Sequence, residues 1–588
     1  MSIQMDVVRI SGFRGISNIE VTLPRVTVLL GQNNAGKTSV IKALHLALGD
    51  YSRFLSEEDF YIDSDENQQD TITVDIRFIA IEGAGRTNTF SEEWLQEFGD
   101  KIQSEADGNQ FVAIRTIAKP DKMKGGYTVE RFHLDSWPER AEWQNARVNK
   151  NNKFGKRIES IPFISIDAQR DIHDELKEKS SFIGRVLSSV AYDDDDVAEL
   201  ERMVGEVNKE AIEKSEPLKK LKEHLDKLSQ SFDSTGQTEI TPFPKKIRDL
   251  SKRFSVHFGE SDKSSFSMEY HGMGTRSWAS LLTVKAFSEL LSQNHKAEAE
   301  PFFPIMAAEE PEAHLHPNAQ RTLFEQLQES TGQVIISTHS PYLVGVSELK
   351  NLRGLRRVLG STHVTQLIKE FDPEDINILQ REIMRFRGEL LFSKALILFE
   401  GVTEEQIIPA MFQKYFGKSC FSVGVSCISV AGKNYPPFIK MANSFGIPVC
   451  IVSDNDGTTR NEIEAQIRKI KQSTSLTLSE EEFFCSFLSD TYDIEAELIH
   501  VLGIRNEVID SLVKTETRGS ENYNYIQAKI NELNMLDNNA LVDKMRSSKA
   551  SYAGYLADVI AKNPNGKAIE SLVPRAVIEA FNKLKEWE

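Results

Sequence analysis

Apolar residues gather along this chain in short runs of strand length, and glycine or polar residues end each run. Between the runs lie segments with apolar residues at helical spacing, among them residues 40–44 and 278–290. Strand-like and helix-like segments in alternation predict an α/β fold. In chain order, the five runs that matter most are residues 26–30, 304–308, 333–336, 395–399 and 451–453.

The middle of the chain has a different pattern. Strand-like runs are absent from Gln169 to His271, and residues 196–230 are polar with apolar side chains recurring at spacings of three, four and seven. This spacing predicts an amphipathic helix, or a pair of helices broken near Pro217. The apolar positions are Leu200, Met203, Val204, Val207, Ile212, Leu218, Leu221, Leu225 and Leu228.

The first run leads into a complete G-x-x-x-x-G-K-[ST] sequence, which a helical pattern follows. Strand, loop and helix in this order form the context in which such a loop binds nucleotide phosphates. The glycines let backbone N–H groups wrap the phosphates, and the helix N-terminus adds its dipole. We expect Lys37 to reach the β- and γ-phosphates of ATP and Thr38 to ligate its Mg²⁺. The predicted nucleotide-binding residues here are Gly31, Asn34, Gly36, Lys37, Thr38 and Ser39.

The second and third runs supply groups suited to ATP hydrolysis. The second ends in Glu309, expected in the Mg²⁺ shell, and Glu310, expected to activate the attacking water; the reverse assignment stays open. The third leads to His339, placed to sense the γ-phosphate. His314 and His316 also follow the acids, but no further ligand stands at zinc spacing. We therefore favour a loop at the nucleotide interface over a metal site for these two histidines.

Carboxylates end the fourth and fifth runs. Glu400 follows one, and Asp454 and Asp456 follow the other. The carboxyl ends of parallel strands meet at one edge of a sheet, so these side chains are expected to converge. Like charges held close raise one another's pKa, and a divalent cation relieves the conflict. Hard carboxylate oxygens predict Mg²⁺ or Mn²⁺ at this edge.

Composition narrows the class of protein. A chain of 588 residues is too long for one core. Its net charge of −18 argues against a broadly basic surface, so contact with nucleic acid would use a local basic segment, such as residues 147–157. That basic run is more simply explained as a solvated loop. There is no apolar run of membrane-spanning length, no secretory signal pattern and no Cys-x-x-Cys pair among the four cysteines. We expect a cytoplasmic protein without a membrane partner.

The nucleotide motifs, with Phe13-Arg14-Gly15 near the start, resemble the ABC-type ATPase heads of the SMC and RecF group. In that group two heads enclose ATP, and a glycine-rich signature segment of one head contacts the nucleotide of the other. The resemblance assigns this role to Gly272, Gly274 and Ser277, although the segment departs from the usual Leu-Ser-Gly-Gly-Gln form. Gln169 is a candidate for the Q-loop, and a plain polar residue at a strand end is the alternative.

The last third resembles a Toprim domain, through Glu400, Gly401 and Glu404 in the form E-G-x-x-E and the pair Asp454 and Asp456. An ATPase head followed by Toprim within one chain is similar to the OLD (overcoming lysogenization defect) family. That family implies further acids, here Asp493 and Glu495, and a late lysine, here Lys549. Helix starts or solvated positions are the alternatives for these residues.

The resemblance also implies a chemistry. Two divalent metals about 3.5–4 Å apart can activate water and stabilise the leaving oxygen of a phosphodiester. The expected metal ligands are Glu400, Glu404, Asp454, Asp456, Asp493 and Glu495, and the expected catalytic residues are Glu310, Glu400 and Lys549. How the ligands divide between the metals stays open.

The expected order of domains is an ABC-type lobe at 1–170, a helical dimerisation insert at 171–265, a second lobe at 266–375 and a Toprim domain with helical additions at 376–588. For the insert, an ordinary helical subdomain packed on its own head is the alternative. The function implied is an ATP-regulated endonuclease acting on duplex DNA in bacterial defence against phage. It would form a homodimer or larger even-numbered oligomer, alone or with a helicase or reverse transcriptase from a neighbouring gene.

Two other classes of function are alternatives. One is a RecF-like, ATP-driven DNA clamp with a silent Toprim domain, which the intact acids disfavour. The other is a topoisomerase or primase. A type IA topoisomerase usually has a third acid two residues after Asp456, where this chain has Thr458, and a primase would add a zinc ribbon, which is absent.

Overall fold

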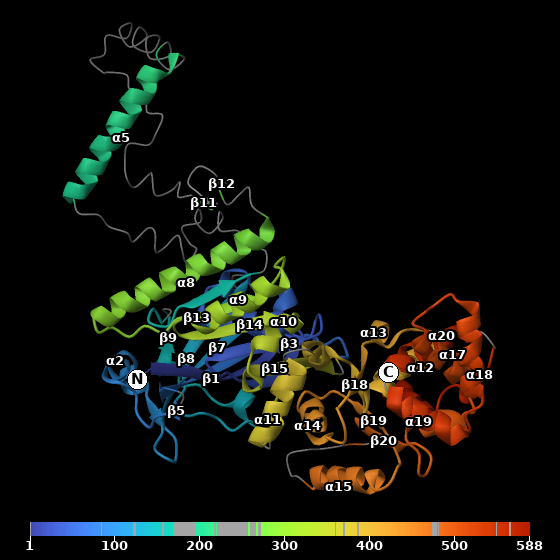
Figure 1. The fold of residues 1–588 in the computed structure, drawn as a ribbon. Helices are drawn as coiled ribbons and strands as arrows, with labels where there is room; N and C mark the ends of the chain where they lie inside the picture. Colours follow the sequence, from blue (N-terminus) through green and yellow to red (C-terminus); the bar gives the residue numbers. More distant parts are fainter. Residues whose placement is uncertain are drawn as a thin grey trace, which may run out of the picture.

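The computed structural model describes residues 2–83, 85–121, 125–155, 158–167, 194–216, 219, 257–258, 266–267, 272–358, 360–367, 371–384, 387–472, 479, 481–548, 550–563 and 566–587. Within these ranges, two large sheets lie in the first part of the chain and a third lies in the last part (Figure 1). Strands β11 (His257–Phe258) and β12 (Phe266–Ser267) form a further, two-stranded sheet. None of the described helices is both long and apolar enough to cross a membrane.

The first sheet is antiparallel and is built around long, mostly buried strands. Its main path runs β2-β1-β4-β7-β8-β9, with β5 and β6 pairing at its side. Helix α1 (Lys37–Leu48) buries its apolar face against both this sheet and the next one. The strands are β1 (Ser2–Phe13), β2 (Ile16–Thr22), β4 (Ile72–Glu82), β5 (Gly85–Arg86), β6 (Gln103–Ser104), β7 (Gln110–Pro120), β8 (Tyr127–His133) and β9 (Lys153–Phe154).

The second sheet carries the nucleotide motifs. Its order is β10-β13-β14-β3-β15-β16, and every pairing except β15 with β16 is parallel. The three runs predicted to end at ATP are β3, β13 and β14. They are consecutive parallel strands, so all three end at the same edge of the sheet. The strands are β10 (Phe163–Ile166), β13 (Ile305–Glu309), β14 (Gln333–Thr338), β3 (Val26–Gly31), β15 (Leu352–Val358) and β16 (Ser361–Gln366).

Helices cover the second sheet. Helix α8 (Met273–Ala297) and α9 (Pro317–Gln328) pack on it through Leu281, Val284 and Leu323. Helix α5 (Asp194–Lys214) lies beyond α8 in Figure 1 and confirms the helical pattern over this part of the insert. Strands β11 and β12 pair antiparallel between Gln169 and His271, so the prediction that this region holds no strands is wrong there. Most of the rest of the predicted insert, Pro217 included, falls outside the described residues.

The third sheet has the order β18-β17-β19-β20, with all strands parallel. Helices flank it and continue to residue 587, as predicted for an α/β domain with helical additions. Its strands are β17 (Ala395–Phe399), β18 (Val425–Ser429), β19 (Val449–Ser453) and β20 (Phe483–Phe487), and the helices used below are α12 (Val402–Phe416), α14 (Pro436–Ser444), α16 (Ile494–Ala496) and α20 (Ala550–Lys562).

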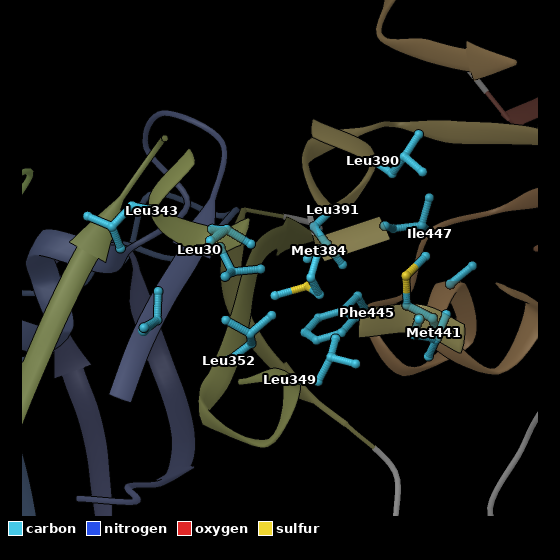
Figure 2. Packing of buried hydrophobic residues seen from close by; sticks show 14 of the residues in the cluster. Leu30, Leu343, Leu349, Leu352, Met384, Leu390, Leu391, Met441, Phe445 and Ile447 are labelled. Carbon is cyan, nitrogen blue, oxygen red and sulfur yellow. The ribbon is translucent and has the colours of Figure 1, made fainter. Parts of the chain in front are cut away.

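A single hydrophobic cluster joins the second and third sheets. Figure 2 shows Leu30 and Leu352 of the second sheet packed with Met384 of the connecting segment and with Phe445 and Ile447, which follow α14. Since apolar packing is close and resists partial displacement, the two parts are mechanically connected. The boundary predicted at 375/376 therefore does not coincide with a break in the core.

Candidate nucleotide site and candidate metal centre

The loop after β3 has the backbone shape that a phosphate-binding loop needs. Gly36, at the N-cap of α1, has φ 105°, and a Cβ there would lie 2.5 Å from Oγ1 of Thr362. Asn34 has φ 62°. A β-carbon is excluded at position 36, so the glycine spacing of the motif follows from local geometry.

Lys37 lies inside this loop. Its Nζ donates to the carbonyl oxygens of Gly31 at 2.9 Å and Gln32 at 3.0 Å, and lies 2.7 Å from Nε2 of His339. Burial lowers the pKa of Lys37 to about 8, although Glu310 and Glu312 act against the shift. Burial and the Lys37 charge also lower the pKa of His339. These two residues, far apart in sequence, are brought together as predicted.

Glu309 at the end of β13 faces the first turn of α1. It forms an ion pair with Lys42 at 3.1 Å and shares a hydrogen bond with the Thr38 side chain. Burial raises the pKa of Glu309, while Lys42 lowers it and Asp167 raises it further. Thr38 and Glu309, both predicted to bind the nucleotide's Mg²⁺, are thus in contact.

Glu310 has φ 43°, an unusual value for a residue other than glycine. Its Oε1 lies 3.4 Å from Nε2 of His339. The sequence reasoning missed Glu312, whose buried Oε1 accepts from Thr338 Oγ1 and from the backbone N–H of His339. The signal available was its place in the acidic run that follows β13.

The predicted signature segment begins α8. Gly274 packs against the loop after β13, where an added Cβ would lie 2.4 Å from the carbonyl oxygen of His314, whereas Gly272 is exposed with open space around it. Ser277 lies in the second turn. His316 is the N-cap of α9 and accepts from Asn318 N at 3.4 Å, which supports the loop interpretation of the two histidines. Gln169 falls outside the described residues.

The acids of the last third lie at one edge of the third sheet. Glu400 follows β17 and Asp454 follows β19, and these strands are parallel neighbours with Leu398 opposite Ile451. Ser453 Oγ donates to Oε1 of Glu400 at 2.7 Å. The convergence predicted from the two apolar runs is therefore present in the fold.

Helix α12 brings Glu404 to the same edge. Its Oε1 accepts from the backbone N–H of Gly401 at 3.2 Å, and its side chain is buried. Burial raises the pKa of Glu404 to about 7, and Glu495 and Glu400 add to the shift. Glu404 is thus also placed to interact with the dipole at the N-terminus of α12, which is the alternative to the predicted metal binding, and this contact does not remove its carboxylate from the cluster.

Asp454 has the largest shift among the acids of this cluster for which a value is resolved. Burial raises its pKa to about 9, with contributions from Glu404, Glu400, Asp493 and Glu495 in that order. Burial also raises the pKa of Glu400 and of Glu495. A carboxyl group that burial and four neighbouring carboxylates together hold protonated near neutral pH marks a site with a deficit of positive charge.

Asp456 lies at the exposed margin of this cluster. Thr459 Oγ1 donates to Oδ1 of Asp456 at 2.6 Å, and Asp456 contributes to the raised pKa of Glu400. Asn455, between the two aspartates, reaches the segment that follows β20 and donates to Leu488 O at 3.0 Å and Asp490 Oδ1 at 2.9 Å. The sequence reasoning missed this residue, which joins the segment bearing the later acids to β19.

The two later acids start α16. Asp493 is its N-cap, accepting from Ala496 N at 2.9 Å, and also pairs with Arg546 Nε at 2.7 Å. Glu495 Oε1 accepts from Thr403 Oγ1 at 3.0 Å and from Tyr552 OH at 3.3 Å. Lys549 falls outside the described residues.

The acids are spread along the edge of the third sheet rather than gathered at one point. Within the described part of the chain, only His295, Glu298 and Glu300 at the end of α8 place three potential ligand atoms within 4.8 Å of one another. No three of the acids at the third sheet are that close. Their donor set consists of carboxylate oxygens, which suits Mg²⁺ or Mn²⁺, and their spread suits more than one ion.

Comparison with known proteins agrees with these two sites. A family model described as an AAA ATPase domain matches residues 4–344, and one described as the Toprim domain of overcoming-lysogenization-defect-like proteins matches residues 391–456. The chain is 25% identical to the Old nuclease of Escherichia phage P2, covering 78% of each chain. It is 24% identical to the OLD nuclease of Thermus scotoductus, covering 76% of this chain and 81% of that one.

Among solved structures, the C-terminal region of the Xanthomonas campestris pv. campestris OLD protein is 21% identical, with a TM-score of 0.25 over 33% of this chain and 96% of that one. The fold, the two sites and the two family models define an ATPase domain joined to a Toprim domain. The chain belongs to the OLD family, and it is a nuclease that carries an ATPase.

Proposed function

We propose that this protein is an ATP-regulated, divalent-metal-dependent endonuclease that cuts duplex DNA in defence against phage. One observation supports the proposal most: five carboxylates converge at the edge of the third sheet, where burial and the other four raise the pKa of Asp454 to about 9. Such a site is stable in its ionised form only with added positive charge, which divalent cations supply.

At the head, the loop from Gly31 to Ser39 and the N-terminus of α1 hold the phosphates of ATP. Lys37 exchanges its carbonyl contacts for the β- and γ-phosphates, and Thr38 with Glu309 holds the Mg²⁺. Glu310 orients the attacking water, and His339 contacts the γ-phosphate. Gly272, Gly274 and Ser277 of a second head complete the site in a homodimer, and Gln169 is proposed for the Q-loop.

At the third sheet, Glu400, Asp454 and Asp456 hold one cation, while Glu404, Asp493 and Glu495 complete a second. Bound cations would lower the pKa of the attacking water and stabilise the leaving oxygen. Ser453 fixes one oxygen of Glu400, and Asn455 keeps the later acids beside β19. Lys549 neutralises charge at the scissile phosphate.

The hydrophobic cluster between the two sheets supports coupling of the sites. Leu30 precedes the phosphate loop and packs in the same cluster as Phe445 and Ile447, which precede β19. Closure of two heads on ATP is proposed either to reposition the metal centres on DNA or to hold them off the DNA until nucleotide is depleted. We place the protein in the cytoplasm with the domain order given above, and a helicase or reverse transcriptase from a neighbouring gene is a proposed partner.

Plasmid nicking with Mn²⁺ or Mg²⁺ tests the proposal. Wild type and Glu405→Gln are expected to nick supercoiled plasmid, and Glu400→Gln is expected to lose nicking by at least about a hundredfold. Glu405 is the matched control because it lies on the same helix but pairs with Arg387 at 2.9 Å outside the acid cluster. Absence of nicking by wild type with every nucleotide and metal would instead favour the DNA-clamp function.

A further inference from the structure

Two hydroxyl groups from different helices bind the same oxygen of Glu495. Thr403 Oγ1 on α12 donates to Oε1 at 3.0 Å, and Tyr552 OH on α20 donates to Oε1 at 3.3 Å. Neither residue was among the predicted site residues. Both hydrogen bonds use Oε1, so they leave Oε2 as the oxygen available to a ligand.

Both donors are held firmly. Thr403 is 7% exposed and Tyr552 is fully buried, and α12 and α20 pack closely along each other. Tyr552 lies in the same hydrophobic core as Ile407 and Met411 of α12. Fixed donors orient a carboxylate with little loss of side-chain entropy at the moment of binding, because that entropy is already lost in the fold.

The groups around Glu495 make such orientation necessary. Asp493, Glu404 and Asp454 interact electrostatically with Glu495, so carboxylates of like charge surround it. Arg546 offers positive charge on this side, but it pairs with Asp493. Repulsion would rotate an unrestrained Glu495 away from the other acids, whereas the two hydroxyl donors hold it among them.

We propose that Thr403 and Tyr552 are positioning residues that fix Oε1 of Glu495, so that Oε2 is presented to a divalent cation. The inference rests on the proposed function in assigning Glu495 as a metal ligand. The two hydroxyls act through Glu495 and touch neither DNA nor metal. They make the position of the later acid depend on the packing of α20 on α12.

Direct Mn²⁺ binding to the full-length, DNA-free protein tests this inference. Free Mn²⁺ is measured by electron paramagnetic resonance during titration of wild type, Thr403→Val, Thr403→Ser and Tyr552→Phe. Valine has the shape of threonine without its hydroxyl, and serine keeps the hydroxyl. Loss of one hydrogen bond to a charged group is expected to weaken the weaker Mn²⁺ site of Thr403→Val and Tyr552→Phe about tenfold, with Thr403→Ser close to wild type.

Nicking as a function of Mn²⁺ gives a second readout. The Mn²⁺ concentration at half-maximal rate is expected to rise about tenfold in Thr403→Val, with the rate at saturating Mn²⁺ within about threefold of wild type. Thermal unfolding in EDTA checks that the variants fold. If Tyr552→Phe is unfolded, the comparison of Thr403→Val with Thr403→Ser tests the inference by itself.

Unchanged Mn²⁺ binding in Thr403→Val, or equal weakening in Thr403→Ser, would overturn the inference. The outcomes also separate it from the proposed function. If wild type fails to nick DNA but its Mn²⁺ affinity depends on the Thr403 hydroxyl, the nuclease proposal fails and the positioning role stands. If wild type nicks DNA and Mn²⁺ affinity does not depend on the Thr403 hydroxyl, only the positioning role is wrong.

Discussion

Replacing Asp454 with asparagine is expected to stabilise the metal-free protein, although the same change removes a proposed metal ligand. In the native state the pKa of this carboxyl group is raised to about 9, first by burial and then by four neighbouring acids. In the unfolded chain an aspartate has a pKa of about 3.9. Asparagine is uncharged and has nearly the same shape, so it removes the cost of this site without opening a cavity.

The sign follows from proton binding. Between pH 4 and 9 the native state holds a proton that the unfolded state releases, so the contribution of Asp454 to stability falls as pH rises through this range. A pH of 7 is about three units above the pKa of an aspartate in the unfolded chain, and each unit corresponds to about 1.36 kcal/mol. Burying Asp454 therefore lowers the free energy of unfolding at pH 7 by at most about 4 kcal/mol. Since the cluster's acids titrate together, we expect Asp454→Asn to gain about 2–4 kcal/mol in EDTA at pH 7.

Thermal unfolding at pH 5, 7 and 8 measures this effect in EDTA and in Mn²⁺. Asp454→Asn should unfold several degrees above wild type in EDTA, with a larger difference at pH 8 than at pH 5. Mn²⁺ should raise the unfolding temperature of wild type more than that of the variant. An Asp454→Asn protein that unfolds at or below the wild-type temperature in EDTA would refute the reasoning.

Two further predictions concern the head. Lys37→Ala should abolish ATP binding, so its nicking should not change when ATP is added. Glu310→Gln should bind ATP without hydrolysing it, so its nicking should change when ATP is added and stay at that level. Nicking by both variants that is the same with and without ATP would contradict the coupling. Gly274→Ala should lower the free energy of unfolding by about 1–3 kcal/mol, because the added Cβ would lie 2.4 Å from the carbonyl oxygen of His314. Gly272→Ala should leave it unchanged, because the space around Gly272 is open. Chemical denaturation measures both variants, and equal stability of the two would contradict the packing argument.

The sequence predicted those parts of the sites that depend on short segments. The phosphate loop, the acids after β13 and the acids after β17 and β19 each follow an apolar strand, and parallel pairing brings strand ends together without further information. The antiparallel sheet of β1, β4 and β7 was not predicted, because its pairings join distant segments and the strands bury nearly every position.

The contacts missed from the sequence are long-range side-chain contacts. Thr403 and Tyr552 reach Glu495 from 92 and 57 residues away, and nothing in a one-dimensional pattern indicates which hydroxyl on a helix will face an acid. The Arg546 pair with Asp493 has the same origin. These contacts arise when helices pack, after the strand ends have already fixed the place of the site.

The location of bound Mn²⁺ tests the central claim most directly. An anomalous difference map from crystals soaked in Mn²⁺ should show ions among Glu400, Asp454 and Glu495 at the edge of the third sheet. Ions bound only at His295, Glu298 and Glu300, where three ligand atoms already lie within 4.8 Å, would contradict a nuclease centre at that edge.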